Sequence, residues 1–392
     1  MALQIIRELA DLNETHTAWR RDLHAHPEIG FEEHRTAAFV AARLAEAGFE
    51  VTTGIAGTGV VGRISTGAGG SIGLRADMDA LPMDEGPGPD ERPWASRHPG
   101  LFHGCGHDGH TTCLLAAAGH LARSRSFQGT LTVIFQPAEE GLGGGARMVD
   151  EGLFERFPCD AVFGFHNMPL LPLGTASVRP GPAMASFDEF KVVMTGRGGH
   201  AGMPHTTRDP ALALAEATCS LQGLVSREVN ANSAAVLSVT QIHVGTTHNV
   251  VADQGWLGGT VRALDEEAHG IIEAGLTRTA NGVAAARGVT AAVDYRRGYP
   301  VLVNDPAETA RAAAVLADLY GGNFRPDFPP LMAAEDFAFM LQKRPGAYLL
   351  FGQGGEGGCM VHNPNYDFDD RLIPMVATAL VRLVESRLPR ST

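Results

Sequence analysis

The sequence predicts an α/β protein, in which a three-layer α/β/α domain with a mostly parallel sheet carries an inserted α+β domain. Two observations support this fold class. Short apolar segments alternate with helical segments over most of the chain, which is typical of a parallel sheet covered on both faces. Between residues 184 and 297 the order changes to βαββαβ, which is typical of a small split βαβ sandwich. We therefore expect one domain from 1–183 and 298–392, with 184–297 inserted.

The first part of the chain justifies the parallel sheet. Residues 1–50 are mainly helical by their apolar spacing of three and four, which continues until Gly48. The run 114–122 predicts another helix, and the proline- and glycine-rich residues 172–183 predict a linker. The predicted strands are 49–55, 60–65, 71–76, 130–135 and 161–165.

The rest of the chain contains the inserted domain and the last elements of the first domain. The inserted segment predicts strand 187–195, helix 209–226, strands 235–244 and 255–263, helix 265–286 and strand 289–296. A helix at 305–320, a strand at 347–351 and an amphipathic helix at 368–388 follow. The glycine-rich stretch 352–358 lacks the Lys-Ser/Thr ending of a phosphate-binding loop, so we expect no phosphate site there.

Composition excludes several classes of function. The net charge is −13 with no run of Lys or Arg, so a nucleic acid partner is not expected. There is no signal-like apolar core near residue 1 and no uninterrupted run of about eighteen apolar residues, so we expect a cytoplasmic protein without a membrane span. The five scattered cysteines argue against a disulfide framework.

The segment 102–111 is the first half of a predicted metal site. It contains three histidines, a cysteine, an aspartate and three glycines. Cys105 and His107 lie two residues apart, and glycines allow the backbone to fold tightly around an ion. A thiolate and an imidazole suit zinc or another borderline divalent cation, but two ligands do not close a site.

Further donors follow the predicted strands. Asp77, the pair Glu139-Glu140 and His166 each come directly after an apolar strand, and ligand sites of such sheets lie beyond the carboxyl ends of the strands. His362 lies in a loop before the last helix. About five ligand groups result: Cys105, His107, one of Glu139 and Glu140, His166 and His362. This is one more than a closed tetrahedral site takes, so we expect two metals that share ligands.

The adjacent glutamates indicate hydrolysis. One carboxylate can bind metal while its neighbour takes a proton from an activated water and passes it to a leaving nitrogen. The pattern leaves open which of Glu139 and Glu140 has which role, and two surface glutamates are the plain alternative. Asp77 could orient a ligand imidazole from behind, with an ordinary strand-end turn as its alternative.

The inserted domain offers a second group of candidates. His200 lies in a glycine-rich turn and could donate to a developing oxyanion. Asn249 and Arg262 are candidates to hold a substrate carboxylate, since an arginine gives a planar two-point contact. A turn residue or a surface ion pair is the alternative for each. His24 and His26 have the spacing of a metal pair, but a surface or hydrogen-bonded loop is favoured there.

Nine segments of the sequence, in order, resemble the M20 metallopeptidase family. More narrowly, they are similar to its amidohydrolase branch, which includes hippurate hydrolase, N-acyl-amino-acid amidohydrolases and plant auxin-conjugate hydrolases. The segments are 73–83, 103–111, 135–141, 164–169, 196–205, 249–254, 259–262, 334–337 and 362–370.

The resemblance implies a two-metal catalytic domain and a lid domain, 184–297, that commonly mediates dimerisation. It implies two divalent ions per subunit (zinc, manganese, nickel or cobalt), a small N-acyl amino acid substrate and a homodimer or higher homo-oligomer. The implied metal ligands are Cys105, His107, Glu140, His166 and His362. Glu139 would be the general base, and Asp77 matches an aspartate behind the ligands.

The resemblance also assigns roles to the lid. His200 would reach the site from the partner subunit and stabilise the tetrahedral intermediate, with Asn249 and Arg262 near the substrate carboxylate. Two positions depart from the wider family: Arg75 occupies the place of the usual ligand histidine, and His107 that of the bridging aspartate. Both departures are typical of the amidohydrolase branch.

Three alternatives to an N-acyl-amino-acid amidohydrolase follow from the same residues. The first is a dipeptidase or exopeptidase with the same machinery. The second uses Cys105 as the nucleophile and His107 as its base, which leaves the glutamate pair without a role. The third is a metal-binding or scaffold protein without catalysis.

Overall fold

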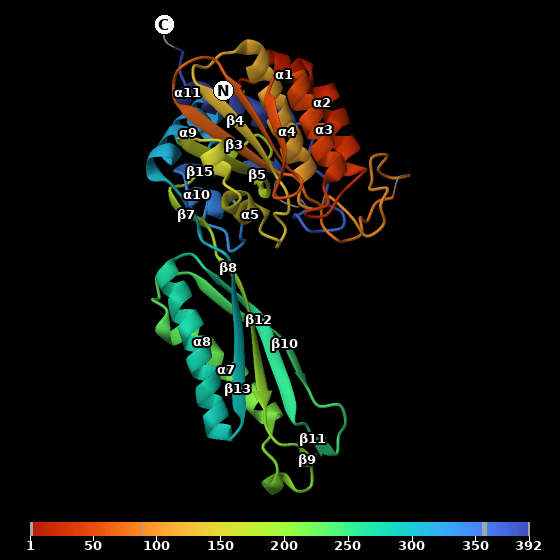
Figure 1. Ribbon diagram of the computed structural model, residues 1–392, viewed down its shortest axis with the longest axis vertical. Helices are drawn as coiled ribbons and strands as arrows, with labels where there is room; N and C mark the ends of the chain where they lie inside the picture. Colours follow the sequence, from red (N-terminus) through yellow and green to blue (C-terminus); the bar gives the residue numbers. More distant parts are fainter. Residues whose placement is uncertain (1–2, 89, 355–358, 391–392) are drawn as a thin grey trace. The chain divides into compact units, whose positions relative to one another are not determined.

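The computed structural model describes residues 3–88, 90–354 and 359–390, and the chain divides into two compact units (Figure 1). Unit 1 consists of Met1–Gly181, Val303–Pro329 and Asp336–Thr392. Unit 2 consists of Pro182–Leu302 and Pro330–Glu335. Unit 2 thus contains the whole predicted insertion, 184–297, and a short later segment.

Unit 1 is built on a seven-stranded sheet in the order β1-β2-β4-β3-β5-β15-β6 (Figure 1). The strands are β1 (Glu50–Ile55), β2 (Gly59–Ser65), β3 (Ser71–Asp77), β4 (Thr130–Gln136), β5 (Ala161–Pro172), β6 (Ala176–Ser177) and β15 (Gly346–Gly354). The four central strands β4, β3, β5 and β15 are parallel, and the edge strands pair antiparallel. The predicted α/β class with a mostly parallel sheet is confirmed.

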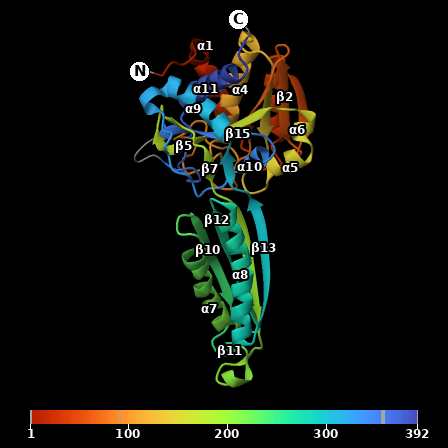
Figure 2. The ribbon, with the colours of Figure 1, turned by 90° about the vertical axis from the view of Figure 1, so that its left-hand side faces the viewer.

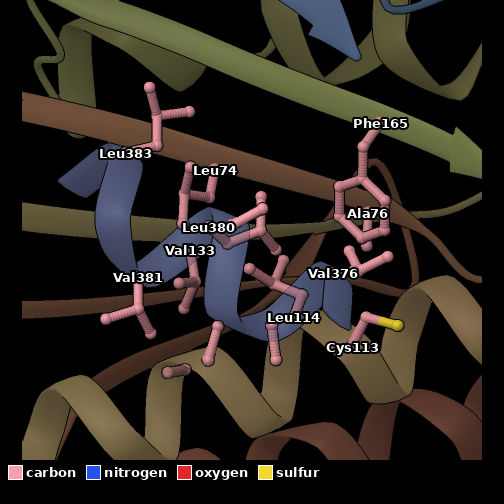
Figure 3. Packing of buried hydrophobic residues seen from close by; sticks show 14 of the residues in the cluster. Leu74, Ala76, Cys113, Leu114, Val133, Phe165, Val376, Leu380, Val381 and Leu383 are labelled. Carbon is pink, nitrogen blue, oxygen red and sulfur yellow. The ribbon is translucent and has the colours of Figure 1, made fainter. Parts of the chain in front are cut away.

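Helices pack on both faces of this sheet. They are α1 (Arg7–Asp11), α2 (Asn13–His24), α3 (His34–Glu46), α4 (His107–Ser124), α5 (Gly144–Asp150), α6 (Leu153–Arg156), α9 (Pro306–Tyr320), α10 (Ala338–Leu341) and α11 (Leu372–Arg387). Side chains of α4 and α11 meet those of β3, β4 and β5 in one core (Figure 3). On β15, Leu349 belongs to this core while Tyr348 contacts Phe337 beside α10, because successive residues of a strand point to opposite faces.

Two sequence predictions for the segment after β4 are wrong. The strand expected at 161–165 is present but continues to Pro172, because β15 pairs with it from Val162 to Met168 and again at Pro172. Residues 172–183 are not a free linker. They supply β6, which pairs antiparallel with β15 at the sheet edge, and the start of β7 (Gly181–Met184), which pairs with β14 (Leu302–Asn304). Such short edge pairings leave no periodic pattern in the sequence.

Helix boundaries also differ from prediction. The helix expected at 114–122 begins at His107, since its first two turns are polar and give no apolar signal. The last helix begins at Leu372 rather than 368. Of the glycine-rich stretch, 352–354 end β15 and 355–358 lie outside the described residues.

Unit 2 has the predicted βαββαβ order. Its antiparallel sheet runs β10-β12-β8-β13, formed by β8 (Phe187–Thr195), β10 (Ala235–Val244), β12 (Gln254–Ala263) and β13 (Thr290–Tyr299). Two helices, α7 (Pro210–Gly223) and α8 (Glu266–Arg287), lie side by side along it (Figure 2), and α7 continues into a π-helical turn, Leu224–Glu228. The side chains of Asp209 and Asp265 accept hydrogen bonds from the first turns of these helices and so fix where they begin.

Candidate metal centre

The structure brings the predicted metal ligands of unit 1 together. Among the described residues, three sets that consist only of predicted ligands and Glu139 have donor atoms within 4.8 Å of one another. These sets are Cys105, His107 and His166; Cys105, Glu140 and His362; and His107, Glu139 and Glu140. Because the sets share members, all five predicted ligands and Glu139 form one cluster. We call these six residues the donor cluster.

A tight turn places Cys105 and His107 in this cluster. His107 is the first residue of α4, and Gly106 before it has φ +95°, a conformation that side chains with a Cβ rarely adopt. A Cβ on Gly106 would lie 2.4 Å from the Tyr366 hydroxyl and 2.7 Å from Oδ1 of Asn167. Glycine at this position therefore allows both the turn and its close packing.

Hydrogen bonds to Nδ1 determine which atom each histidine presents. Nδ1 of His166 lies 2.6 Å from the carbonyl oxygen of Asn167, and Nε2 lies 3.3 Å from the Cys105 sulfur. Nδ1 of His107 lies 3.2 Å from Oδ1 of Asp79. Nε2 of His107 is buried and has no hydrogen-bond partner within the described part of the chain. Both rings thus offer Nε2 as a ligand, as metal-bound histidines do when the other nitrogen is held.

The glutamate pair lies in the turn after β4. Glu139 is buried, and the backbone N–H of Glu140 donates to Oδ2 of Asp79 at 2.9 Å. Oε1 of Glu140 is 3.1 Å from Nε2 of His362. His362 has φ +63° and its N–H donates to the carbonyl of Gly104 at 2.8 Å, so the last loop is attached to the metal loop.

The electrostatics of the cluster favour a cation. Burial, with Glu140 as the largest nearby charge, raises the pKa of the Cys105 thiol well above its usual value. Burial opposes protonation of His107, but Asp77, Asp79 and Glu140 outweigh it and raise its pKa to about 10. The carboxylates that attract a proton here would equally attract divalent ions, which would bind the thiol as thiolate. The donor set therefore fits a metal centre.

Asp77 lies behind this cluster at the end of β3. Its Oδ1 is 2.6 Å from Nδ1 of His110, and its Oδ2 accepts from Arg75 at 2.8 Å and lies 3.8 Å from Nε2 of His107. Burial opposes ionisation of Asp77, but the charges of His107, Arg75 and His110 hold its pKa well below the usual range.

Sequence reasoning missed several residues that hold the site. Asp79 carried a signal, because it lies two residues from Asp77, and His110 is three residues after His107 on one helix face. Asn167 and Tyr366 carried no such signal in the sequence. The side-chain amide of Asn167 donates to the Tyr366 hydroxyl at 2.8 Å.

The pair His24 and His26 stays outside the donor cluster. Nδ1 of His24 is 2.8 Å from Oδ2 of Asp108, and Nδ1 of His26 is 2.8 Å from the carbonyl oxygen of Asp22. Both histidines are hydrogen-bonded, as the alternative to a metal pair predicts, but His24 is buried as the last residue of α2 rather than in a loop.

In unit 2, the candidate residues lie in two places. His200 is exposed in β9 (Gly199–His200), and the carbonyl of Asn249, just before β11 (Val250–Val251), accepts from the residue after His200 at 3.1 Å. Arg262 lies on β12, half-buried, with its guanidinium 4.2 Å from the ring centre of Phe187. Strand β12 starts at Gln254, close in the chain to β11. Arg262 lies eight residues after Gln254, and a strand rises ~3.3 Å per residue, so Arg262 is about 26 Å along β12 from the end near His200 and Asn249.

Fold and site together define an α/β metalloprotein with a carboxylate, Glu139, beside its metal donors. The chain belongs to peptidase family M20/M25/M40, whose model matches residues 73–386. The resemblance seen in the sequence is confirmed.

The chain is similar over nearly its whole length to curated relatives with related activities. It is 38% identical to hippurate hydrolase from Campylobacter jejuni, over 97% of this chain and 98% of that protein. It is 38% identical to N-acetyl-L-cysteine deacetylase from Bacillus subtilis, over 90% and 83%. It is 35% identical to thermostable carboxypeptidase 2 from Saccharolobus solfataricus, over 92% of each.

Solved structures share this fold. A putative aminohydrolase from methicillin-resistant Staphylococcus aureus superimposes with a TM-score of 0.90 at 32% identity, over 98% of this chain and 99% of that one. The YXEP protein of Bacillus subtilis, described as a dinuclear metal-binding peptidase of family M20, superimposes with a TM-score of 0.83 at 32% identity, over 96% and 98%.

Proposed function

We propose that this protein is a metal-dependent amidohydrolase that cleaves the amide bond of N-acyl amino acids, releasing a carboxylic acid and the free amino acid. The observation that carries the proposal is the buried Glu139 carboxylate within the donor cluster. The names of the hippurate hydrolase and deacetylase relatives support this substrate class. The name of the carboxypeptidase relative supports the second candidate, a dipeptidase or exopeptidase.

In this proposal two divalent ions bind to the five predicted ligands. Zinc, manganese, nickel and cobalt all suit a set of thiolate, imidazole and carboxylate donors. The ligands are Cys105, His107, Glu140, His166 and His362. When bound, these ions polarise the amide carbonyl and acidify water. The dinuclear description of the YXEP protein supports two ions rather than one.

Glu139 is then the general base. Its carboxylate accepts a proton from the attacking water and returns it to the amide nitrogen as the carbon–nitrogen bond breaks. Asp77 acts from behind the cluster, where it holds His110 and approaches His107.

The raised pKa of Cys105 argues against a nucleophilic cysteine, because a nucleophile needs a lowered one. The Cys105 sulfur also lies 3.3 Å from Nε2 of His166, whereas that mechanism takes His107 as the base.

Unit 2 acts as a lid and dimerisation domain in this proposal. His200 donates to the oxyanion that develops on the substrate carbonyl. Arg262 and Asn249 bind the substrate carboxylate. The distance of about 26 Å along β12 separates Arg262 from the end that carries His200 and Asn249. One substrate cannot span both ends of a single lid, which supports a homodimer in which His200 and Asn249 come from the partner subunit and Arg262 from the other.

We also propose a cytoplasmic location. All five cysteines are free thiols, as expected of a reducing compartment. No helix in the described residues is long and apolar enough to cross a membrane.

The substrate class is tested by turnover of purified protein after metal reconstitution, with metal content measured by elemental analysis. Hippurate and N-acetylmethionine should be cleaved faster than simple dipeptides. Faster dipeptide cleavage would favour the exopeptidase instead. Activity that survives chelation but is lost on thiol alkylation would favour Cys105 as the nucleophile.

The two glutamates give a matched pair of variants that tests the catalytic assignment. Glu139→Gln should keep its metal but lose turnover about 10²–10⁴-fold, because acid–base catalysis is removed. Glu140→Gln should instead lose bound metal. A Glu139→Gln protein with normal turnover, or with no metal, would contradict the proposed division of roles.

A further inference from the structure

The turn that carries the glutamate pair begins with a strained residue. Ala138, directly before Glu139, has φ +55°, in the left-handed region that residues with a Cβ avoid. Such a conformation persists only where surrounding contacts impose it. The contacts that impose it therefore also determine where Glu139 points.

A buried carboxylate makes one of these contacts. Glu33 is fully buried, and its Oε1 accepts a hydrogen bond from the backbone N–H of Ala138 at 2.8 Å. Its Oε2 accepts from the hydroxyl of Thr58. Glu33 belongs to none of the donor sets among the described residues, so its contacts give it no role as a ligand.

Neighbouring glycines enclose the same turn. A Cβ on Gly30 would lie 2.9 Å from Cα of Ala138, and a Cβ on Gly144 would lie 1.8 Å from the carbonyl oxygen of Pro137. Gly144 also donates its N–H to the carbonyl of Ala138 at 2.9 Å. The backbone of Ala138 is thus packed against protein, where its N–H needs an internal acceptor, and Glu33 is that acceptor.

A second carboxylate holds the other side of Glu139. Asp79 accepts from the N–H of Glu140 at 2.9 Å, so the residues before and after Glu139 are each bonded to a carboxylate. Asp79 also contacts the predicted ligand His107, whereas the Glu33 carboxylate accepts from Ala138 in the turn and from Thr58 and lies in no donor set of the described residues. A change at Glu33 should therefore alter the orientation of the Glu139 side chain without altering a metal ligand.

We propose that Glu33 is a positioning residue for Glu139. Its carboxylate holds Ala138 in the left-handed conformation and thereby aims the Glu139 carboxylate at the reacting water. This inference rests on the proposed function of Glu139 as general base. It predicts a loss in turnover without a loss of metal, since misplacing a catalytic group by a fraction of an ångström is costly to rate.

The role of Glu33 depends on hydrogen bonding and not on charge. Glutamine can reproduce both bonds, because its carbonyl can accept from Ala138 and its amide can donate to the Thr58 hydroxyl. Alanine can reproduce neither. Glycine at position 138 adopts φ +55° without strain, so it reduces the need for Glu33.

The experiment compares full-length, metal-loaded variants on an N-acyl amino acid that the wild type cleaves. Glu33→Ala should lower kcat on the order of 10–100-fold, with KM and metal content close to wild type. Glu33→Gln should retain kcat within about threefold, since it keeps both bonds. The double variant Glu33→Ala/Ala138→Gly should recover several-fold in kcat over Glu33→Ala. If Glu33→Ala does not fold, Thr58→Val replaces it, because this change removes only the hydroxyl that donates to Oε2 of Glu33. Thr58→Val should also lower kcat, and adding Ala138→Gly should raise kcat again.

Glu28 is a matched control. It is a nearby carboxylate that accepts from the N–H groups of Arg35 and Thr36, and so holds the start of α3 rather than the turn. Glu28→Ala should lower stability and leave kcat of the folded enzyme unchanged. The inference is wrong if Glu33→Ala matches Glu28→Ala in kcat, or if Ala138→Gly restores nothing. If the wild-type protein cleaves only dipeptides, the proposed substrate class is wrong. The role of Glu33 can then still be tested by comparing kcat of the same variants on a dipeptide.

Discussion

At the scale of single residues, the site depends on partners that leave the correct donor atom available. Asp79 illustrates this. One carboxylate oxygen faces Nδ1 of His107 and the other accepts from the N–H of Glu140. The same side chain therefore orients the imidazole of one predicted ligand and the backbone of another. It ties two ligands from different parts of the chain into one geometry.

Removing Asp79 should weaken metal binding. We expect Asp79→Ala to lower metal affinity about 10–100-fold, the usual effect of losing a partner behind a ligand. Competition with a chelator of known affinity measures the change. Asp84→Asn is the control, since Asp84 is an exposed residue of the same segment that accepts from the N–H of Gly100. Equal affinities for both variants would show that Asp79 does not orient the ligands.

The sequence identified the members of the donor cluster better than the residues that hold them. Cys105, His107 and the glutamate pair belong to chemically unusual motifs, so they could be found one by one. Glu33 could not, because two glutamates before a helix are an ordinary surface pattern. Its role exists only because the fold buries it against Ala138. The assignments of catalytic roles stay predictions that the variants above test.

At the scale of elements, prediction succeeded where local pattern and tertiary contact agree. Helices α8 and α9 start within a residue of the prediction, and an aspartate caps each of them. Prediction failed where pairing with another strand determines the extent of an element. Pairing with β15 extends β5, and β6 is a strand only because its two residues pair with β15. The polar start of α4 was missed because its residues serve the metal site rather than the core.

One element contact in unit 2 predicts a pH dependence. His269 on α8 hydrogen bonds Oδ2 of Asp188 on β8, and the hydroxyl of Tyr295 on β13 donates to the same oxygen at 2.6 Å. The bond to Asp188 raises the pKa of His269, although partial burial and Arg297 oppose it. The contact thus joins α8 to two strands of the sheet.

A raised pKa in the folded state fixes the sign of this effect. The stabilisation is fully present below the unfolded histidine pKa of about 6.5 and is lost as pH rises through the higher folded value. Amide hydrogen exchange of α8, corrected for the intrinsic effect of pH, should therefore show weaker protection above that range than at pH ~6. His269→Gln should flatten the dependence, and His248→Gln, at an exposed position, should not. A profile unchanged by His269→Gln would contradict the prediction.

At the scale of the whole molecule, the separation of His200 from Arg262 within one unit 2 has a functional consequence. If each active site takes Glu139 from one subunit and His200 from its partner, defects in these two residues complement each other. A heterodimer of one His200→Ala chain and one Glu139→Gln chain then contains one intact site and one site with both defects. If His200 acts within its own subunit, both sites of that heterodimer are defective.

Co-expression of the two chains with different tags, followed by purification on both tags, isolates this heterodimer. We expect about half of wild-type kcat per dimer, because a two-fold symmetric dimer has two equivalent sites and one is restored. Each homodimer should stay near its own low rate. The control pairs Glu139→Gln with His166→Ala; both defects lie in unit 1, so neither arrangement restores a site. A His200→Ala/Glu139→Gln heterodimer no more active than this control would place His200 in its own subunit, and would require a lid geometry in which Arg262 and His200 serve different substrates or different steps.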